Sequence, residues 1–216
     1  MGLFDDLLKK AGDKAKNSLN NLSTTASHKV KSEINSGVND AINKIKFEAS
    51  VKRRKVKLDR LPENVEEMKA LSVYDQKNEY VVAALTIVAL LRYGQNKEDG
   101  KAMLDLLNGP DSPANRDLML MDLKLGEKDY LMRSYFEGAT PENGYTPAQP
   151  YTVELIEYSN SREEENYVYL SVVCGGADNP RQIRLRKKPS TGEWFIWIFQ
   201  GLLSDIRIPK SEDPWA

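Results

Sequence analysis

Residues 80–91 read YVVAALTIVALL and form the most apolar run of this 216-residue chain. After Tyr80, only Thr86 interrupts the run. Its twelve residues are too few to cross a bilayer, because a spanning helix needs about 20. A helix that is apolar on every side lies inside a protein, where other elements cover its whole surface. We therefore expect a buried central helix around which a globular domain packs.

The sequence on either side of this run predicts further helices over residues 61–137. The pair Leu61 and Pro62 marks the start of the domain, because a residue that precedes proline avoids the helical conformation. The central helix should end near Tyr93 with Gly94 as its cap, since glycine favours the left-handed cap position. Asn96 is then the expected N-cap of the next helix, because its side chain can accept hydrogen bonds from free amide groups.

Residues 150–200 have the composition of β-strands separated by turns. Four runs are predicted to be strands, at 151–158, 167–174, 181–188 and 193–199. Because the links between them are short, they predict a four-stranded antiparallel sheet in which consecutive strands pair. Residues 201–216 follow as a C-terminal tail. The fold class that we expect for residues 61–216 is therefore α+β, with a helical half and a sheet half.

The last two predicted strands place arginine and aromatic residues on one face of the sheet. Pairing of residue 188 with residue 193 sets Arg186 opposite Phe195 and Arg184 opposite Trp197. Guanidinium groups stack on aromatic rings, so these four side chains are our candidate binding surface. The alternative is that helices or the C-terminal tail cover this face. The opposite face should form the core, through Ile183, Leu185, Trp194, Ile196 and Ile198.

The first 58 residues predict an amphipathic helical arm. Apolar residues recur every three or four positions along a narrow stripe of mostly small side chains. Residues 1–60 hold 14 Lys/Arg and 7 Asp/Glu, so they carry a charge of +7 and the remaining residues carry −8. Such a basic arm suits shallow insertion into an anionic membrane surface or packing against a partner helix. The contact residues that we expect are Leu3, Phe4, Leu7 and Leu8.

Other roles for the arm stay open at this point. It could associate with a second copy of the chain, dock on the acidic body or be disordered. The run KRRK at residues 52–55 closes the arm and is interpreted as a solvated helix end or linker. Binding of phosphates or lipid headgroups is the alternative for this run.

Little in the sequence indicates catalysis. There is one cysteine, Cys174, and one histidine, His28, so an intramolecular disulfide and metal sites built on His or paired Cys are excluded. A phosphate-binding loop that ends in GK[ST] is also missing from the sequence. Carboxylates such as Glu154 and Glu157 remain available for acid–base chemistry. We therefore predict no catalytic residue, no metal and no cofactor.

Three stretches carry a resemblance to a known family. They are SYFEGATPENGYTPAQPYT at residues 134–152, GGADNPRQIRLRKKPSTGEWFIW at 175–197 and GLLSDIRIPKSEDPWA at 201–216. In these stretches the chain resembles an uncharacterised bacterial family that is known as a domain of unknown function. The resemblance covers roughly residues 61–216 and implies a bacterial, cytoplasmic setting. It implies no activity, ligand or catalytic residue.

The pattern as a whole favours a non-enzymatic binding or scaffolding protein, attached through its arm to a membrane surface or to a partner helix. An enzyme with a carboxylate, Tyr and Arg pocket between helices and sheet is the first alternative. A nucleic-acid binder that uses the basic arm and the arginine face is the second, and the acidic body argues against it. The lone cysteine and the lack of a signal peptide predict a cytoplasmic location, with peripheral membrane contact as an alternative.

Overall fold

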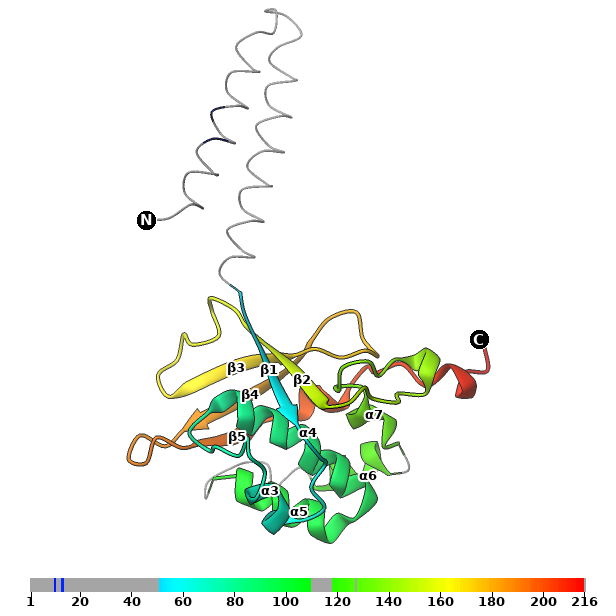
Figure 1. The fold of residues 1–216 in the computed structure, drawn as a ribbon, viewed down its shortest axis with the longest axis horizontal. Helices are drawn as coiled ribbons and strands as arrows, with labels where there is room; N and C mark the ends of the chain where they lie inside the picture. Colours follow the sequence, from blue (N-terminus) through cyan, green and yellow to red (C-terminus); the bar gives the residue numbers. More distant parts are fainter. Residues whose placement is uncertain (1–9, 11–12, 14–50, 110–117, 127, 216) are drawn as a thin grey trace, which may run out of the picture. The chain divides into compact units, whose positions relative to one another are not determined.

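Figure 1 shows the computed structural model, which describes residues 10, 13, 51–109, 118–126 and 128–215. The chain divides into two compact units, Met1–Val51 and Lys52–Ala216, and the second contains the elements discussed below. Lys10 and Asp13 are helical, but the rest of residues 1–50 lies outside the described part. The arm contacts predicted there, Leu3, Phe4, Leu7 and Leu8, therefore also lie outside it.

The predicted central helix is α4, Glu79–Gln95. Asn78 begins the helix, because its side-chain oxygen accepts hydrogen bonds from two amide groups of the first turn. The helix continues through Gly94, so the prediction of a cap at that glycine is wrong. Asn96 ends α4 and, as predicted, its side chain also caps the next helix. One residue therefore turns the chain directly from α4 into α5.

Four shorter helices and three 3-10 turns complete the non-strand elements that are described. The helices are α3 (Val65–Lys69), α5 (Lys97–Leu107), α6 (Leu118–Leu125) and α7 (Tyr130–Arg133). The 3-10 turns are η2 (Pro141–Asn143), η3 (Gln200–Leu203) and η4 (Lys210–Glu212). In Figure 1, α3, α5 and α6 lie with α4 on one side of the sheet.

The sheet has five antiparallel strands in the order β1-β2-β3-β4-β5. They are β1 (Lys52–Leu58), β2 (Tyr151–Glu157), β3 (Tyr167–Val172), β4 (Arg181–Lys187) and β5 (Trp194–Ile198). The α+β class and the meander of the last four strands are as predicted, but the expectation of four strands is wrong. The fifth strand, β1, includes the KRRK run at residues 52–55, so the interpretation of this run as a solvated helix end or linker is wrong. The strand pairs with β2 along its full length and buries Val56 and Leu58.

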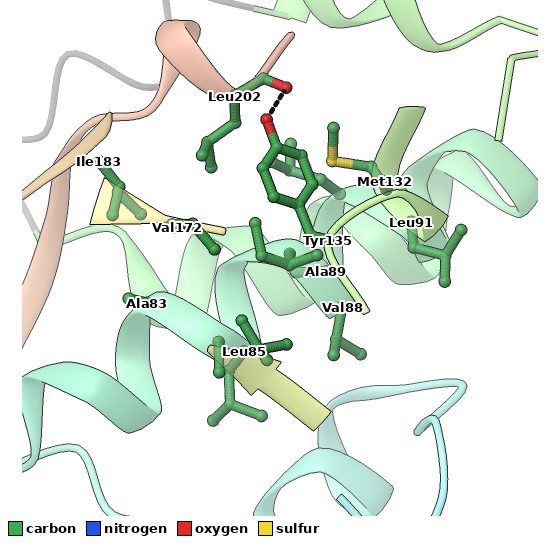
Figure 2. Close-up of a cluster of buried hydrophobic side chains, with 14 of the residues drawn as sticks. Ala83, Leu85, Val88, Ala89, Leu91, Met132, Tyr135, Val172, Ile183 and Leu202 are labelled. Atoms are coloured by element: carbon green, nitrogen blue, oxygen red, sulfur yellow. Dashed lines mark hydrogen bonds between the residues drawn. The ribbon is translucent and has the colours of Figure 1, made fainter. Parts of the chain in front are cut away.

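The core lies between α4 and the inner face of the sheet. All residues of α4 from Val81 to Leu91 are buried, as expected for a helix that is apolar all round. Figure 2 shows Leu85 and Val88 of this helix packed among side chains that come from the sheet, from α7 and from η3. In the same cluster the Tyr135 hydroxyl donates a hydrogen bond of 2.7 Å to the carbonyl oxygen of Leu202, which satisfies both buried polar groups.

The pairing of β4 with β5 begins in the predicted register and then shifts. Arg186 lies opposite Phe195, as predicted, but Arg184 lies opposite Ile198 instead of Trp197. The shift lies between Arg184 and Leu185, where a β-bulge lets two residues of β5 oppose one residue of β4. Ile198, which was expected in the core, is consequently 39% exposed.

Candidate functional site

The candidate site is the arginine–aromatic face, defined here as Tyr167, Tyr169, Arg184, Arg186 and Trp197. It lies on the outer side of strands β3 to β5, away from α4. The register sets Tyr167 opposite Arg186 and Tyr169 opposite Arg184. Because alternate residues of a strand share a side, the two tyrosines and two arginines form adjacent rows.

The side chains of this face interlock through cation–π contacts. The Arg184 guanidinium carbon lies 4.1 Å from the Tyr167 ring centre and 4.9 Å from that of Tyr169. Arg186 lies 4.9 Å from the Trp197 ring centre and 5.6 Å from that of Tyr167. Tyr167 and Trp197 also meet edge to face at 5.7 Å. Each arginine is therefore held by two rings, which limits its rotamers and makes the surface rigid.

The two arginines differ in exposure and in charge pairing. The Arg184 side chain is 14% exposed and forms an ion pair with Glu164. Arg186 is exposed, and no ion pair joins it to any described residue. The open part of the face thus offers the Arg186 guanidinium, the partly exposed Trp197 ring and the Tyr169 ring, which is 39% exposed.

The structure brings together three of the four predicted residues as one stack. Arg184, Arg186 and Trp197 contact one another through Tyr167, whereas Phe195 packs close to Gly109 at the edge of the sheet. A Cβ atom on Gly109 would lie 3.2 Å from Phe195 Cγ. Tyr167 and Tyr169 are site residues that were not predicted from the sequence. Their spacing of two within a predicted strand was the available signal, since it matches the spacing of the two arginines.

A second polar cluster joins the start of α4 to the end of β2. Glu157 is 4% exposed and accepts two hydrogen bonds of 2.9 Å from the Arg162 guanidinium. The Tyr80 hydroxyl and the Lys52 ammonium group also donate to it. Arg162 forms a further ion pair with Glu79. This cluster contains the carboxylate, Tyr and Arg groups expected of a pocket between helices and sheet.

Its electrostatics favour a structural role. The hydrogen bonds from Arg162, followed by those from Tyr80 and Lys52, lower the pKa of Glu157 from 4.5 to about 2, although burial opposes them. Burial and the hydrogen bond to Glu157 raise the pKa of Tyr80 to about 12. A carboxylate with so low a pKa is a weak base, and a phenol with so high a pKa is a weak acid. All charges of the cluster are paired, and the cluster therefore stabilises the contact between α4 and the sheet.

Cys174 and His28 are the remaining groups that the sequence offers for nucleophilic or acid–base chemistry. Cys174 is buried, where its sulfur lies 3.2 Å from Ser134 Oγ, and burial raises the pKa of its thiol. His28 lies outside the described residues. Within the described part of the chain, no group of three or more His, Cys, Asp or Glu side chains could hold a metal ion. In the same residues, no helix has the length and apolar character that a membrane span requires.

Together these features define an α+β domain with helices on one side of an antiparallel meander and an arginine–aromatic surface on the other. The chain belongs to the family described as Domain of unknown function (DUF6935), whose family model matches residues 60–210. This match confirms the resemblance to a family of unknown function. No curated protein matches the chain, and no solved structure does.

Proposed function

We propose that residues 52–216 form a non-enzymatic binding module whose contact surface is the arginine–aromatic face. The observation that supports this function is the stack in which Tyr167 and Trp197 hold the exposed Arg186 guanidinium. Arginine, tyrosine and tryptophan are the residues that contribute most to binding at protein interfaces. Because these side chains are already ordered by one another, a partner would lose little conformational entropy by binding them.

The chemistry of the face indicates the kind of partner. Arg184 is neutralised by Glu164, so the free charge of the face is that of Arg186. A protein surface that carries a carboxylate beside an apolar or aromatic side chain would match one guanidinium flanked by rings. A single-stranded nucleic acid could also stack on such rings, but residues 52–216 hold 23 Lys/Arg and 26 Asp/Glu and so carry a net charge of −3. This acidic body would repel phosphates, so a protein partner is favoured.

The same proposal gives the N-terminal arm the role of attachment device, on a membrane surface or on a partner helix. The support is its basic charge and its helical spacing of apolar residues, led by Leu3, Phe4, Leu7 and Leu8. Co-sedimentation of the full chain with anionic vesicles, lost on Leu7→Glu and Leu8→Glu substitution, would support membrane contact. Equal sedimentation of both proteins would contradict it.

Site-specific photo-crosslinking tests the binding surface directly. Benzoylphenylalanine in place of Tyr169 should yield a discrete crosslinked product in a lysate of the source cells. The same group at Lys69, an exposed position on α3, is the matched control and should yield none. Adding Arg186→Ala should abolish the product at residue 169, because it removes the free charge of the face.

Two results would contradict the proposal. One is a product that forms equally at residues 69 and 169, and the other is a product at residue 169 that survives Arg186→Ala. A product that disappears on nuclease treatment would show a nucleic acid instead of a protein on this face.

A further inference from the structure

Strand β1, drawn in cyan in Figure 1, is an edge strand, and among the described residues no strand pairs with it on the side away from β2. In β2, the carbonyl oxygens of Glu154 and Thr152 accept hydrogen bonds from Val173 and Glu137, which do not belong to β1. Even-numbered residues of β2 therefore direct their backbone groups away from β1, and odd-numbered residues direct theirs toward it. In the observed register, the odd-numbered residues of β2 pair with even-numbered residues of β1.

The remaining residues of β1 consequently face the open edge. The N–H and C=O groups of Arg53, Lys55 and Lys57 point there, and no backbone hydrogen bond joins them to another described residue. Such a row of unused donors and acceptors is a template for one more strand.

A groove of about 630 Å³ runs along this edge. One wall consists of the consecutive β1 residues 54–57, and the other is the segment 73–81 that leads into α4. Because consecutive strand residues point to opposite faces, a groove lined by all four must follow the edge of the strand. Its apolar lining comes from Val56 and Val81, which are buried, and from Val73 and Tyr80, which are partly exposed.

The charged groups that line the groove leave it positive. Arg54, Lys57 and Lys77 are exposed, and no ion pair or side-chain hydrogen bond joins them to the described residues. The lining also contains two acidic residues. The Asp75 carboxylate accepts a hydrogen bond from the backbone amide of Lys77, and Glu79 forms an ion pair with Arg162. The fourth cation, Lys55, pairs with Glu137.

We propose that an acidic peptide segment of a partner protein binds in this groove as a sixth strand on the free edge of β1. Its backbone bonds to Arg53, Lys55 and Lys57, and its carboxylates lie near Arg54, Lys57 and Lys77. This mode, in which main-chain hydrogen bonds supply affinity and side chains supply specificity, is strand addition. The surface is separate from the arginine–aromatic face, so the two proposals stand or fall independently.

Proline at residue 55 provides a sharp test. The Lys55 amide points to the open edge, so Lys55→Pro removes a donor to the peptide and leaves the β1–β2 hydrogen bonds in place. Lys55→Ala removes the same charge and keeps the amide, which makes it the matched control. The probe is a fluorescein-labelled ten-residue peptide of alternating Glu and Val, titrated with the full chain and followed by fluorescence anisotropy.

We expect saturable binding that Lys55→Pro weakens at least tenfold and Lys55→Ala changes about twofold or less. A peptide with Lys in place of Glu should not bind, because it meets a groove of like charge. Equal affinity of the proline and alanine variants, equal binding of the lysine peptide, or no saturable binding of the acidic peptide would each overturn the proposal.

If the thermal melt shows that Lys55→Pro does not fold, a second pair of variants tests the proposal. The triple variant Arg54→Gln, Lys57→Gln, Lys77→Gln should lose binding. A control triple with the same loss of charge, at exposed lysines away from the groove, should keep it; these are Lys69→Gln, Lys124→Gln and Lys128→Gln. Equal binding by the two triples would overturn the proposal, since it would show attraction by net charge or by the basic arm.

Discussion

At the scale of single residues, Glu157 links the stability of the domain to pH. Its pKa falls from 4.5 to about 2 because Arg162, Tyr80 and Lys52 donate hydrogen bonds to the ionised carboxylate. A group whose pKa is lower in the folded state stabilises the fold above its unfolded pKa. This stabilisation is therefore complete above about pH 4.5 and is lost as the pH falls toward 2.

Replacement of Glu157 by Gln should remove this pH dependence. At neutral pH we expect the free energy of unfolding to fall by about 1.5–3 kcal/mol, the usual value of hydrogen bonds to a charged group. Between pH 4.5 and 2, the difference between the wild type and the variant should shrink. Urea denaturation over a pH series measures both effects, with the exposed Glu66→Gln as control. A difference that is constant with pH would show that Glu157 is not the titrating group.

At the scale of elements, α4 and α5 approach each other so closely that one glycine is required. A Cβ atom on Gly100 of α5 would lie 2.2 Å from the Cα and N atoms of Tyr93 in α4. Gly94 of α4 differs, since a Cβ atom there would lie 3.9 Å from Leu125 Cβ, an ordinary contact. The two glycines lie in neighbouring helices, but only one of them faces a backbone.

Alanine at these two positions should have opposite effects. Gly94→Ala should stabilise the domain by about 0.5–1 kcal/mol, because alanine loses less conformational entropy in a helix. Gly100→Ala gains the same entropy but forces the helices apart, and overpacking of this kind costs about 1–3 kcal/mol. Thermal melts of both variants measure the difference. Stabilisation by both would mean that the helices do not pack this closely.

At the scale of the whole molecule, the position of β1 decides where the folded unit begins. The strand adds Val56, 6% exposed, and Leu58, fully buried, to the core of the domain. Burial of an aliphatic side chain of this size contributes about 1.5–3 kcal/mol. Two such residues amount to a large part of the total stability of a domain, which is about 5–15 kcal/mol.

Truncation at two points tests this boundary. Residues 52–216 should unfold cooperatively, at a temperature close to that of the full chain. Residues 61–216, which correspond to the domain predicted from the sequence, lack β1 and should be less stable by about 3–6 kcal/mol. Urea denaturation of the two fragments provides the comparison, and equal stability would show that β1 is dispensable.

Features that depend on neighbouring residues were predictable from the sequence. The apolar run of α4, the capping of α5 by Asn96 and the pairing of Arg186 with Phe195 each follow from a local pattern of residue types. Strand β1 has no such pattern, because five of its seven residues are basic and its partner β2 begins at Tyr151. From the sequence alone, a basic run is interpreted as exposed to solvent, because the strand with which it pairs is not known.

The candidate sites likewise combine features that could be predicted from the sequence with features that could not. The sequence by itself determined that arginines and aromatic residues share one face of the last two strands, because side chains alternate along a strand. Only the tertiary structure decided that Tyr167 and Tyr169 of β3 complete that face, that a bulge turns Ile198 outward and that a groove follows the edge of β1. The physical reason is that strand pairing and helix packing join residues far apart in the chain, and their contact depends on the register and packing of the whole domain.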